Sequence, residues 1–263
     1  MLRNVHRRED LGKNLTWPKP PAVLNDFVTK LKHIHQMWRG RMIMNKMPEQ
    51  LKQSFPEKVA AFEAFNGKRH EWGYQRYWIG DYLSHDIEHD SMEVGHTYRT
   101  ALSNMHEKYP YTKVLFSSYV QKFNRFNKSA YRVVVVTDKF VAKLEPKKFK
   151  PMKEPIQLSL ITGISVSSAS NGIVVFHIGD NDLVGCLRNK NNEDRVGELV
   201  GTLGAFFERN LHRQLRVTVA PTIDCKLGNK QRELHVQNQA NGVGQVPLFK
   251  SAIGQQIELV YGA

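Results

Sequence analysis

Hydrophobic positions in the first fifth of the chain recur at helical spacing. They are separated by three or four residues, so they share one face of a helix. The proline-rich segment 17–21 opposes helix, and Pro48 ends the pattern. The residues on this face are Val23, Phe27, Leu31, Ile34, Trp38 and Met42. A second helical pattern begins at Pro56 and runs to Tyr82, although Gly67 and Gly73 weaken its interior.

From Lys113 the period changes to that of strands. Short β-branched runs alternate with turns rich in Gly, Asn, Asp and Ser, and predict strands at 114–123, 131–136, 140–144, 156–166, 173–178 and 183–187. A helix is predicted from Asn192 to Phe207. More strands follow at 215–220, 225–227, 233–236 and 256–261. This order predicts an α+β protein: N-terminal helices, then an antiparallel barrel of pleckstrin-homology type capped by a C-terminal helix, with extra C-terminal strands.

Positive charge is concentrated in two parts of the chain. Residues 1–52 carry +7, residues 54–112 carry −3, residues 113–153 carry +9 and residues 154–263 are neutral, which sums to the net +13. We therefore expect three regions: 1–50, 51–112 with an acidic linker, and 113–263, with the barrel at about 113–211. A basic edge on a β-domain attracts anions.

Several classes of protein are disfavoured by the sequence. No apolar run approaches the roughly 18 residues that cross a bilayer, and the first residues lack the apolar core of a secretory signal, so a cytoplasmic protein is expected. Cys186 and Cys225 have no framework spacing and are expected to be reduced. The segment His85 to His89 matches H-x-x-E-H, but its acidic surroundings disfavour zinc. We expect no catalytic residues, no metal and no cofactor.

The segment from Ile34 to Met44 fits, with lapses, the pattern I-Q-x-x-x-R-G-x-x-x-R of helices that calmodulin-like light chains bind. Such a partner buries apolar anchors and pairs its acidic side chains with arginine. A basic amphipathic helix packed on its own domain is the alternative. The predicted calmodulin-binding residues are Ile34, His35, Trp38, Arg39, Gly40 and Met44.

Other motifs along the chain resemble the tails of short-tailed class I myosins, especially the myosin-ID branch. They include Gly80-Asp-Tyr-Leu, Lys122-Phe-Asn-Arg-Phe, Leu160-Ile-Thr-Gly-Ile and Arg195-Val-Gly-Glu-Leu-Val-Gly. The resemblance implies the end of a lever arm followed by a tail-homology-1 domain that binds acidic phospholipids. No G-x-x-x-x-G-K-[ST] loop is present, so ATPase activity and actin binding are expected in a motor outside these residues. The resemblance also implies a peripheral location at the cell cortex, plasma membrane or endosomes.

Lipid-binding modules of this fold hold phosphates with a basic residue late in strand one and a basic pair early in strand two. Ala130 occupies one position of that pair, which predicts modest headgroup selectivity. The implied lipid-binding residues are Lys122, Arg125, Lys128, Arg132 and Lys139. The alternatives are a nucleic-acid-binding protein, which charge alone suggests, and a peptide-binding scaffold. We expect phospholipid and calmodulin as partners and no nucleic acid.

Overall fold

The computed structural model describes residues 22–85, 92–124, 126, 128–179, 181–187, 193–228, 230–239, 248–250 and 256–262. The chain divides into two compact units, residues 1–52 and 53–263. The first unit contains helix α2 (Ala22–Lys46), followed by the short helix α3 (Glu49–Gln53) at the boundary. The expected helix from Val23 to Met42 is therefore confirmed. No helix in the described residues is long and apolar enough to cross a membrane.

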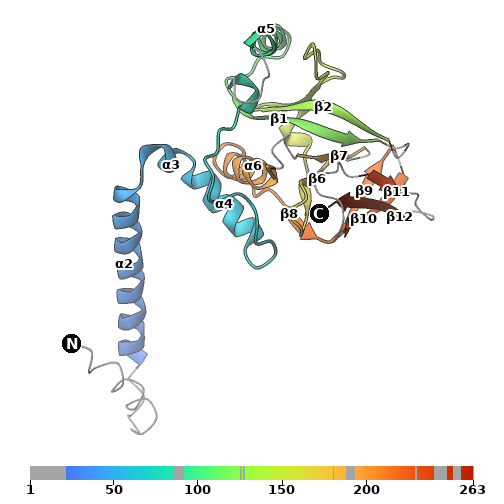
Figure 1. Cartoon of the computed structure of the whole chain (residues 1–263). Helices are drawn as coiled ribbons and strands as arrows, with labels where there is room; N and C mark the ends of the chain where they lie inside the picture. The colour runs from blue at the N-terminus through green and yellow to red at the C-terminus, as the bar shows by residue number, and fades with distance from the viewer. Residues whose placement is uncertain are drawn as a thin grey trace. The chain divides into compact units, whose positions relative to one another are not determined.

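In its described residues, the second unit combines helices with two sheets (Figure 1). Its helical elements are α4 (Phe55–Phe65), η1 (Tyr82–Ser84), α5 (Met92–Lys108), η3 (Leu158–Leu160) and α6 (Val196–Leu211). The first strands are β1 (Val114–Phe123), β2 (Ser129–Thr137), β3 (Phe140–Leu144), β4 (Ile156–Gln157), β5 (Gly163–Ser167), β6 (Ile173–His177) and β7 (Leu183–Cys186). The last strands are β8 (Val217–Ala220), β9 (Thr222–Leu227), β10 (Lys230–Gln239), β11 (Leu248–Lys250) and β12 (Gln256–Gly262).

The larger sheet has eight strands in the order β4-β3-β2-β1-β7-β6-β5-β8. Its neighbours are antiparallel except β5 and β8. The mixed α+β class is confirmed. The two edge strands, β4 and β8, do not pair with each other, so the described strands form no closed barrel. The remaining described strands form a separate sheet in the order β11-β12-β10-β9.

Residues 53–85 and 92–112 belong to the same compact unit as the β-region. Helix α4 lies against α6 (Figure 1). The predicted second helix ends at Phe65, far short of Tyr82, because Gly67 and Gly73 adopt positive φ angles of 70° and 76° that break a right-handed helix. Helix α5 was not predicted, although Val94, Tyr98, Ala101 and Met105, which pack in one core cluster, recur at helical spacing.

The register of the first hairpin gives its two faces different partners. Lys122, Val120 and Phe116 pair with Ala130, Arg132 and Val136, so these even-numbered residues share one face. That face forms the main core with β5, β6 and α6. The opposite face forms a second core under α5. Burial on both faces explains why the apolar run 133–136 does not alternate with polar residues.

Two motifs that carried the family resemblance pack against each other. The Arg195 guanidinium lies 3.6 Å from the centroid of the Tyr82 ring. The Glu198 carboxylate accepts hydrogen bonds from the backbone N–H of Gly80, at 2.7 Å, and from the Tyr82 hydroxyl. Burial and the negative charge of Glu198 raise the pKa of Tyr82, so the phenol stays protonated and donates. These residues hold segment 69–82 on α6.

Candidate functional site

A group of cations converges near the turn end of the first hairpin. Lys122 on β1, Arg132 on β2 and Lys143 on β3 occupy the same face, since Lys122 pairs with Ala130 and Val134 pairs with Lys143. Lys153 adds a fourth cation from the segment after β3. They line a cavity of about 120 Å³, together with Asn124, Ala130 and Met152. We call this cavity the cationic basin.

The basin lies on the same face as the main core, where the apolar side chains give way to charged ones. Lys122, Arg132 and Lys143 are half-buried there. None of the seven residues that line the basin is acidic, and these cations form no ion pair with a carboxylate in the described residues. The site therefore concentrates positive charge that only a ligand or solvent balances.

The pKa values of two lysines record this crowding. Burial, and then the positive charges of Lys122 and Lys153, lower the pKa of Lys143 to about 8. Burial, followed by the charges of Lys153 and Arg132, also lowers the pKa of Lys122. An anion in the basin would reverse the electrostatic part of both shifts, because an opposite charge favours the protonated amine.

A structured loop carries Lys153 to the basin. The backbone N–H of Phe149 donates to Glu145 O and that of Glu145 donates to Lys150 O, both at 2.9 Å. The loop then returns along β3, where the Met152 N–H donates to Lys143 O at 3.0 Å. This return places Met152 and Lys153 beside Lys143.

The structure separates the lipid-binding residues expected from sequence. Lys122 and Arg132 lie together in the basin. Lys128 is exposed in the β1–β2 turn, where its N–H donates to Asn124 Oδ1, and Arg125 lies outside the described residues. Lys139 lies in the β2–β3 turn, beyond the end of β2 at Thr137, which follows Arg132 by five residues, or about 17 Å at about 3.3 Å per residue. It is therefore remote from the basin.

Sequence reasoning did not identify Lys143 and Lys153 as site residues. Lys143 alternates with the core residue Val141, so the strand pattern alone places both on one face. The strand pattern identifies Lys143 as a basin residue only once the register is known, because the register places Lys143 beside β2 and its cation Arg132. The position of Lys153 depends on the loop from Glu145 to Met152, for which the sequence offers no comparable pattern.

The candidate light-chain site on α2 retains exposed apolar residues. Ile34 is 60% exposed and Trp38 is 57% exposed, and the rings of His35 and Trp38 lie 6.2 Å apart. A Cβ atom added at Gly40 would meet no atom within 4 Å, so its own surroundings do not require glycine there. Arg39 is also exposed, whereas Met44 is half-buried.

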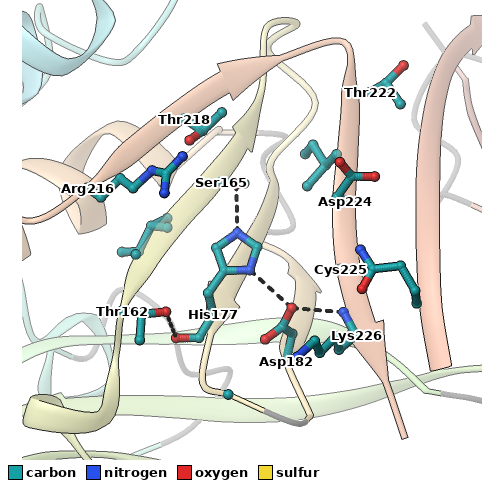
Figure 2. Close-up of a pocket in the computed structure, with 15 residues that line it drawn as sticks. Thr162, Ser165, His177, Asp182, Arg216, Thr218, Thr222, Asp224, Cys225 and Lys226 are labelled. Carbon is teal, nitrogen blue, oxygen red and sulfur yellow. Dashed lines mark hydrogen bonds and ion pairs between the residues drawn. The ribbon is translucent and has the colours of Figure 1, made fainter. Parts of the chain in front are cut away.

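A Ser-His-Asp array lies in a second, polar cavity of about 530 Å³ (Figure 2). His177 Nε2 lies 2.7 Å from Ser165 Oγ, and its Nδ1 lies 3.0 Å from Asp182 Oδ2. Ser165 belongs to β5, which is paired on both sides, so its own backbone supplies no free oxyanion donor. Asp182 also accepts the backbone N–H of Lys226 at 2.9 Å. The array therefore joins the two sheets and has a structural role.

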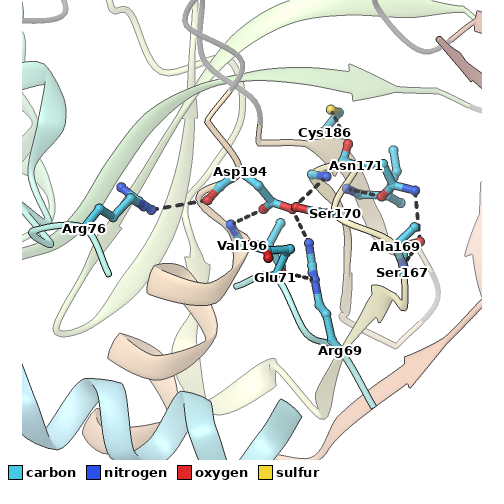
Figure 3. Close-up of polar contacts among 12 residues, drawn as sticks. Arg69, Glu71, Arg76, Ser167, Ala169, Ser170, Asn171, Cys186, Asp194 and Val196 are labelled. Atoms are coloured by element: carbon cyan, nitrogen blue, oxygen red, sulfur yellow. Dashed lines mark hydrogen bonds and ion pairs between the residues drawn. The ribbon is translucent and has the colours of Figure 1, made fainter. Parts of the chain in front are cut away.

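A further polar cluster, around Asp194, holds distant segments together (Figure 3). Its carboxylate accepts hydrogen bonds from Arg69, from the Gly172 N–H at 3.2 Å and from the Val196 N–H at 2.9 Å. It thereby joins the segment after α4, the turn before β6 and the start of α6. Neither cluster resembles a metal centre, and no described group of three or more His, Cys, Asp or Glu side chains has the geometry to hold a metal ion. Residues 86–89 of the H-x-x-E-H segment lie outside the described residues.

The fold and the basin define a class of protein: a mixed α+β module that carries a partly buried cationic site. Residues 69–253 match the family model described as "Unconventional myosin tail, actin- and lipid-binding". The chain belongs to this tail-homology-1 family of class I myosins, as its motifs predicted. The family description includes actin binding, which we had expected only in the motor.

Several relatives align with nearly all of this chain. Unconventional myosin ID of Drosophila melanogaster is 35% identical over 267 residues, which cover 97% of this chain and 26% of the relative. Unconventional myosin-Id of Homo sapiens is 36% identical over 243 residues, covering 91% and 24%. Unconventional myosin-Ig of Mus musculus is 37% identical over 229 residues, covering 86% and 22%. The chain thus spans about a quarter of the length of these curated relatives.

Proposed function

We propose that this tail attaches to membranes by binding the phosphate groups of anionic phospholipids in the cationic basin. One observation carries the proposal: four basic side chains from separate parts of the β-region meet in one cavity that no carboxylate lines. Uncompensated, half-buried cations cost stability in the free protein. Their convergence is understandable if an anion neutralises them in the bound state. The family's description as lipid-binding supports the same function.

The basin favours charge density over one particular headgroup. Ala130 lies opposite Lys122, at the position where the basic pair of the expected pattern would supply another phosphate contact. Lys143 and Lys153 add charge from other directions. We therefore propose that phosphoinositides bind with modest selectivity and that dense phosphatidylserine partly substitutes for them. Lys128 and Arg125 would add attraction from the hairpin turn, at about 1 kcal/mol per cation.

We also propose that α2 binds calmodulin or a related light chain. The exposed Ile34 and Trp38 supply apolar anchors, and Arg39 supplies a cation for an acidic partner. In the complete protein these two functions would link an actin-based motor to membranes at the cell cortex, plasma membrane or endosomes. The bent sheet with α6 is the part that we propose as a pleckstrin-homology-like module.

Vesicle sedimentation tests the lipid proposal. The protein is incubated with vesicles of phosphatidylcholine alone, or with added phosphatidylserine or phosphatidylinositol bisphosphate. We expect sedimentation only with the anionic vesicles, since binding requires negative charge. Heparin and single-stranded DNA serve as competitors. Equal binding to neutral vesicles would contradict the requirement for negative charge, and stronger binding to DNA than to anionic vesicles would favour the nucleic-acid-binding alternative.

A further inference from the structure

A groove between α5 and the loop after β3 is separate from the basin. It has a volume of about 620 Å³. One wall is formed by residues on one side of α5 between His96 and Lys108, together with Tyr109, and the other wall is formed by residues 148–151 of the loop. Helix α5 covers the hairpin face opposite the basin. We call this cavity the α5 groove.

The floor of the α5 groove is apolar and firmly supported. Ala101 and Tyr109 line it and are half-buried, whereas Met105 and Phe149 line it and are buried. Phe149 is completely buried, and its ring packs edge-on against Tyr98 with centroids 5.2 Å apart. Because Phe149 belongs to the second core, the loop wall of the groove is fixed to the body of the unit. The packing of Phe149 in this core therefore holds the loop wall of the groove in place.

The rim of the groove is basic. Lys108 extends from the end of α5, and Lys148 and Lys150 extend from the loop on either side of Phe149. All three are exposed, and none forms an ion pair among the described residues. No Asp or Glu lines the groove. A ligand that fits both parts has an apolar body and a negatively charged head.

We propose that the α5 groove binds a single anionic lipid molecule, with one alkyl chain on the apolar floor and the charged head on the three lysines. A peptide would have to leave its backbone N–H and C=O groups unpaired on such a floor, whereas an alkyl chain has no polar group to satisfy. The site is additional to the proposed basin, because it uses the other face of the hairpin and shares none of its lining residues.

Isothermal titration with dodecyl phosphate below its micellar concentration tests the proposal. Dodecyl maltoside, with the same chain and a neutral head, and inorganic phosphate, with no chain, are the matched probes. We expect saturable binding of one dodecyl phosphate in the groove and binding at least about tenfold weaker for either matched probe. Equal affinity for dodecyl maltoside would show an unspecific apolar surface and would overturn the proposal.

Variants locate the bound molecule. Asn104→Trp places a large side chain at an exposed position on the groove wall, and the double variant Lys108→Ala/Lys150→Ala removes charge from both sides of the rim. Each should weaken dodecyl phosphate binding by roughly tenfold or more. Lys147→Ala is the control, because Lys147 is exposed in the same loop and lines neither cavity.

The Lys122→Ala variant separates this proposal from the one for the basin. It should leave dodecyl phosphate binding in the groove unchanged and weaken vesicle binding. Loss of dodecyl phosphate binding in Lys122→Ala, with no loss in the double lysine variant, would assign the probe to the basin and exclude the groove. Thermal denaturation checks that each variant is folded; the double lysine variant alters only exposed side chains and decides the matter if Asn104→Trp is unstable.

Discussion

Lys143 shows how a single residue of the proposed lipid site would balance stability against binding. Its side chain lies half-buried on the core-side face of the hairpin, and burial lowers its pKa to about 8 from the usual 10.5. Between these values the unfolded chain binds more protons than the folded one, so the free energy of unfolding rises with pH through that window. At neutral pH the protonated amine is a destabilising feature, which a bound anion would relieve.

Replacement of Lys143 by methionine should therefore stabilise the free protein and weaken lipid binding. Removal of the half-buried charge should raise the free energy of unfolding at pH 7 by roughly 1–2 kcal/mol after allowance for solvent screening. Thermal denaturation and vesicle sedimentation measure the two effects. A variant that is less stable than the wild type, or that binds vesicles equally well, would contradict this account of the basin.

The cations in the basin should matter more than cations outside it. Lys122→Ala or Arg132→Ala removes a partner of a bound phosphate and should cost roughly 1–3 kcal/mol of binding free energy. Lys147→Ala acts only through a screened field and should cost about 1 kcal/mol or less, most of which disappears near 0.5 M salt. Vesicle binding at low and high salt compares them. Equal losses for all three variants would indicate a diffuse basic patch.

At the scale of elements, glycines permit the close packing of α6 on α4 and on the segment that follows α4. A Cβ atom at Gly197 would lie 1.9 Å from Trp72 O, and one at Gly201 would lie 2.3 Å from Glu57 O. Both contacts involve backbone atoms, which cannot move aside as a flexible side chain does. The family motif that contains these glycines is therefore explained by helix packing, not by ligand binding.

Gly197→Ala should accordingly separate α6 from segment 69–82. We expect a loss of at least 2–3 kcal/mol in the free energy of unfolding, because overpacking here displaces backbone. Gly204→Ala is the control, since its Cβ would lie 3.3 Å from the Ala60 methyl group. Chemical denaturation of the two variants gives the comparison, and similar stabilities would refute the packing argument.

The proposed light-chain site also belongs to one element, α2. The double variant Ile34→Ala/Trp38→Ala should abolish co-elution with calmodulin, because apolar anchors supply most of the buried area in such complexes. Ile43→Ala is a matched control: Ile43 is 57% exposed but follows Ile34 by nine residues, or two and a half helical turns, and so lies on the opposite side. Retained co-elution of the double variant would exclude these anchors.

At the scale of the whole molecule, the Asp182 cluster couples the two sheets. Burial alone would raise the pKa of Asp182, but hydrogen bonds from His177 and from the backbone N–H groups of Lys226 and Ile178 lower it below its usual value. The resulting stabilisation is present above the unfolded-state pKa near 3.9 and is lost as pH falls through the lower folded-state value. Acid should thus weaken the attachment of the second sheet.

Asp182→Asn tests this coupling. The amide retains an acceptor oxygen but loses the charge that strengthens three hydrogen bonds, so we expect a loss of roughly 1–3 kcal/mol at pH 7. Hydrogen exchange should show the effect first in β9, where the Lys226 N–H donates to Asp182 at 2.9 Å. Unchanged exchange of the β9 amides would show that the sheets are held together by other contacts.

The sequence by itself determined the features that depend on local pattern. It indicated α2, the strands β1 and β3 with correct bounds, helix α6, the concentration of charge between Lys113 and Lys153, and the family. These predictions succeeded because side-chain periodicity and turn residues act over a few neighbours. That Lys122 and Arg132 lie near each other could be predicted for the same reason, since both belong to one hairpin.

Only the tertiary structure decided which lysines meet and what covers the hairpin. Lys143 reaches the basin through the β2–β3 register, and Lys153 reaches it through a loop held by Phe149 in a core that α5 completes. Arg195 and Glu198 lie more than 100 residues after Tyr82, and both contact its side chain only when α6 and segment 69–82 are docked. Such contacts depend on chain closure over long separations, which no local pattern encodes.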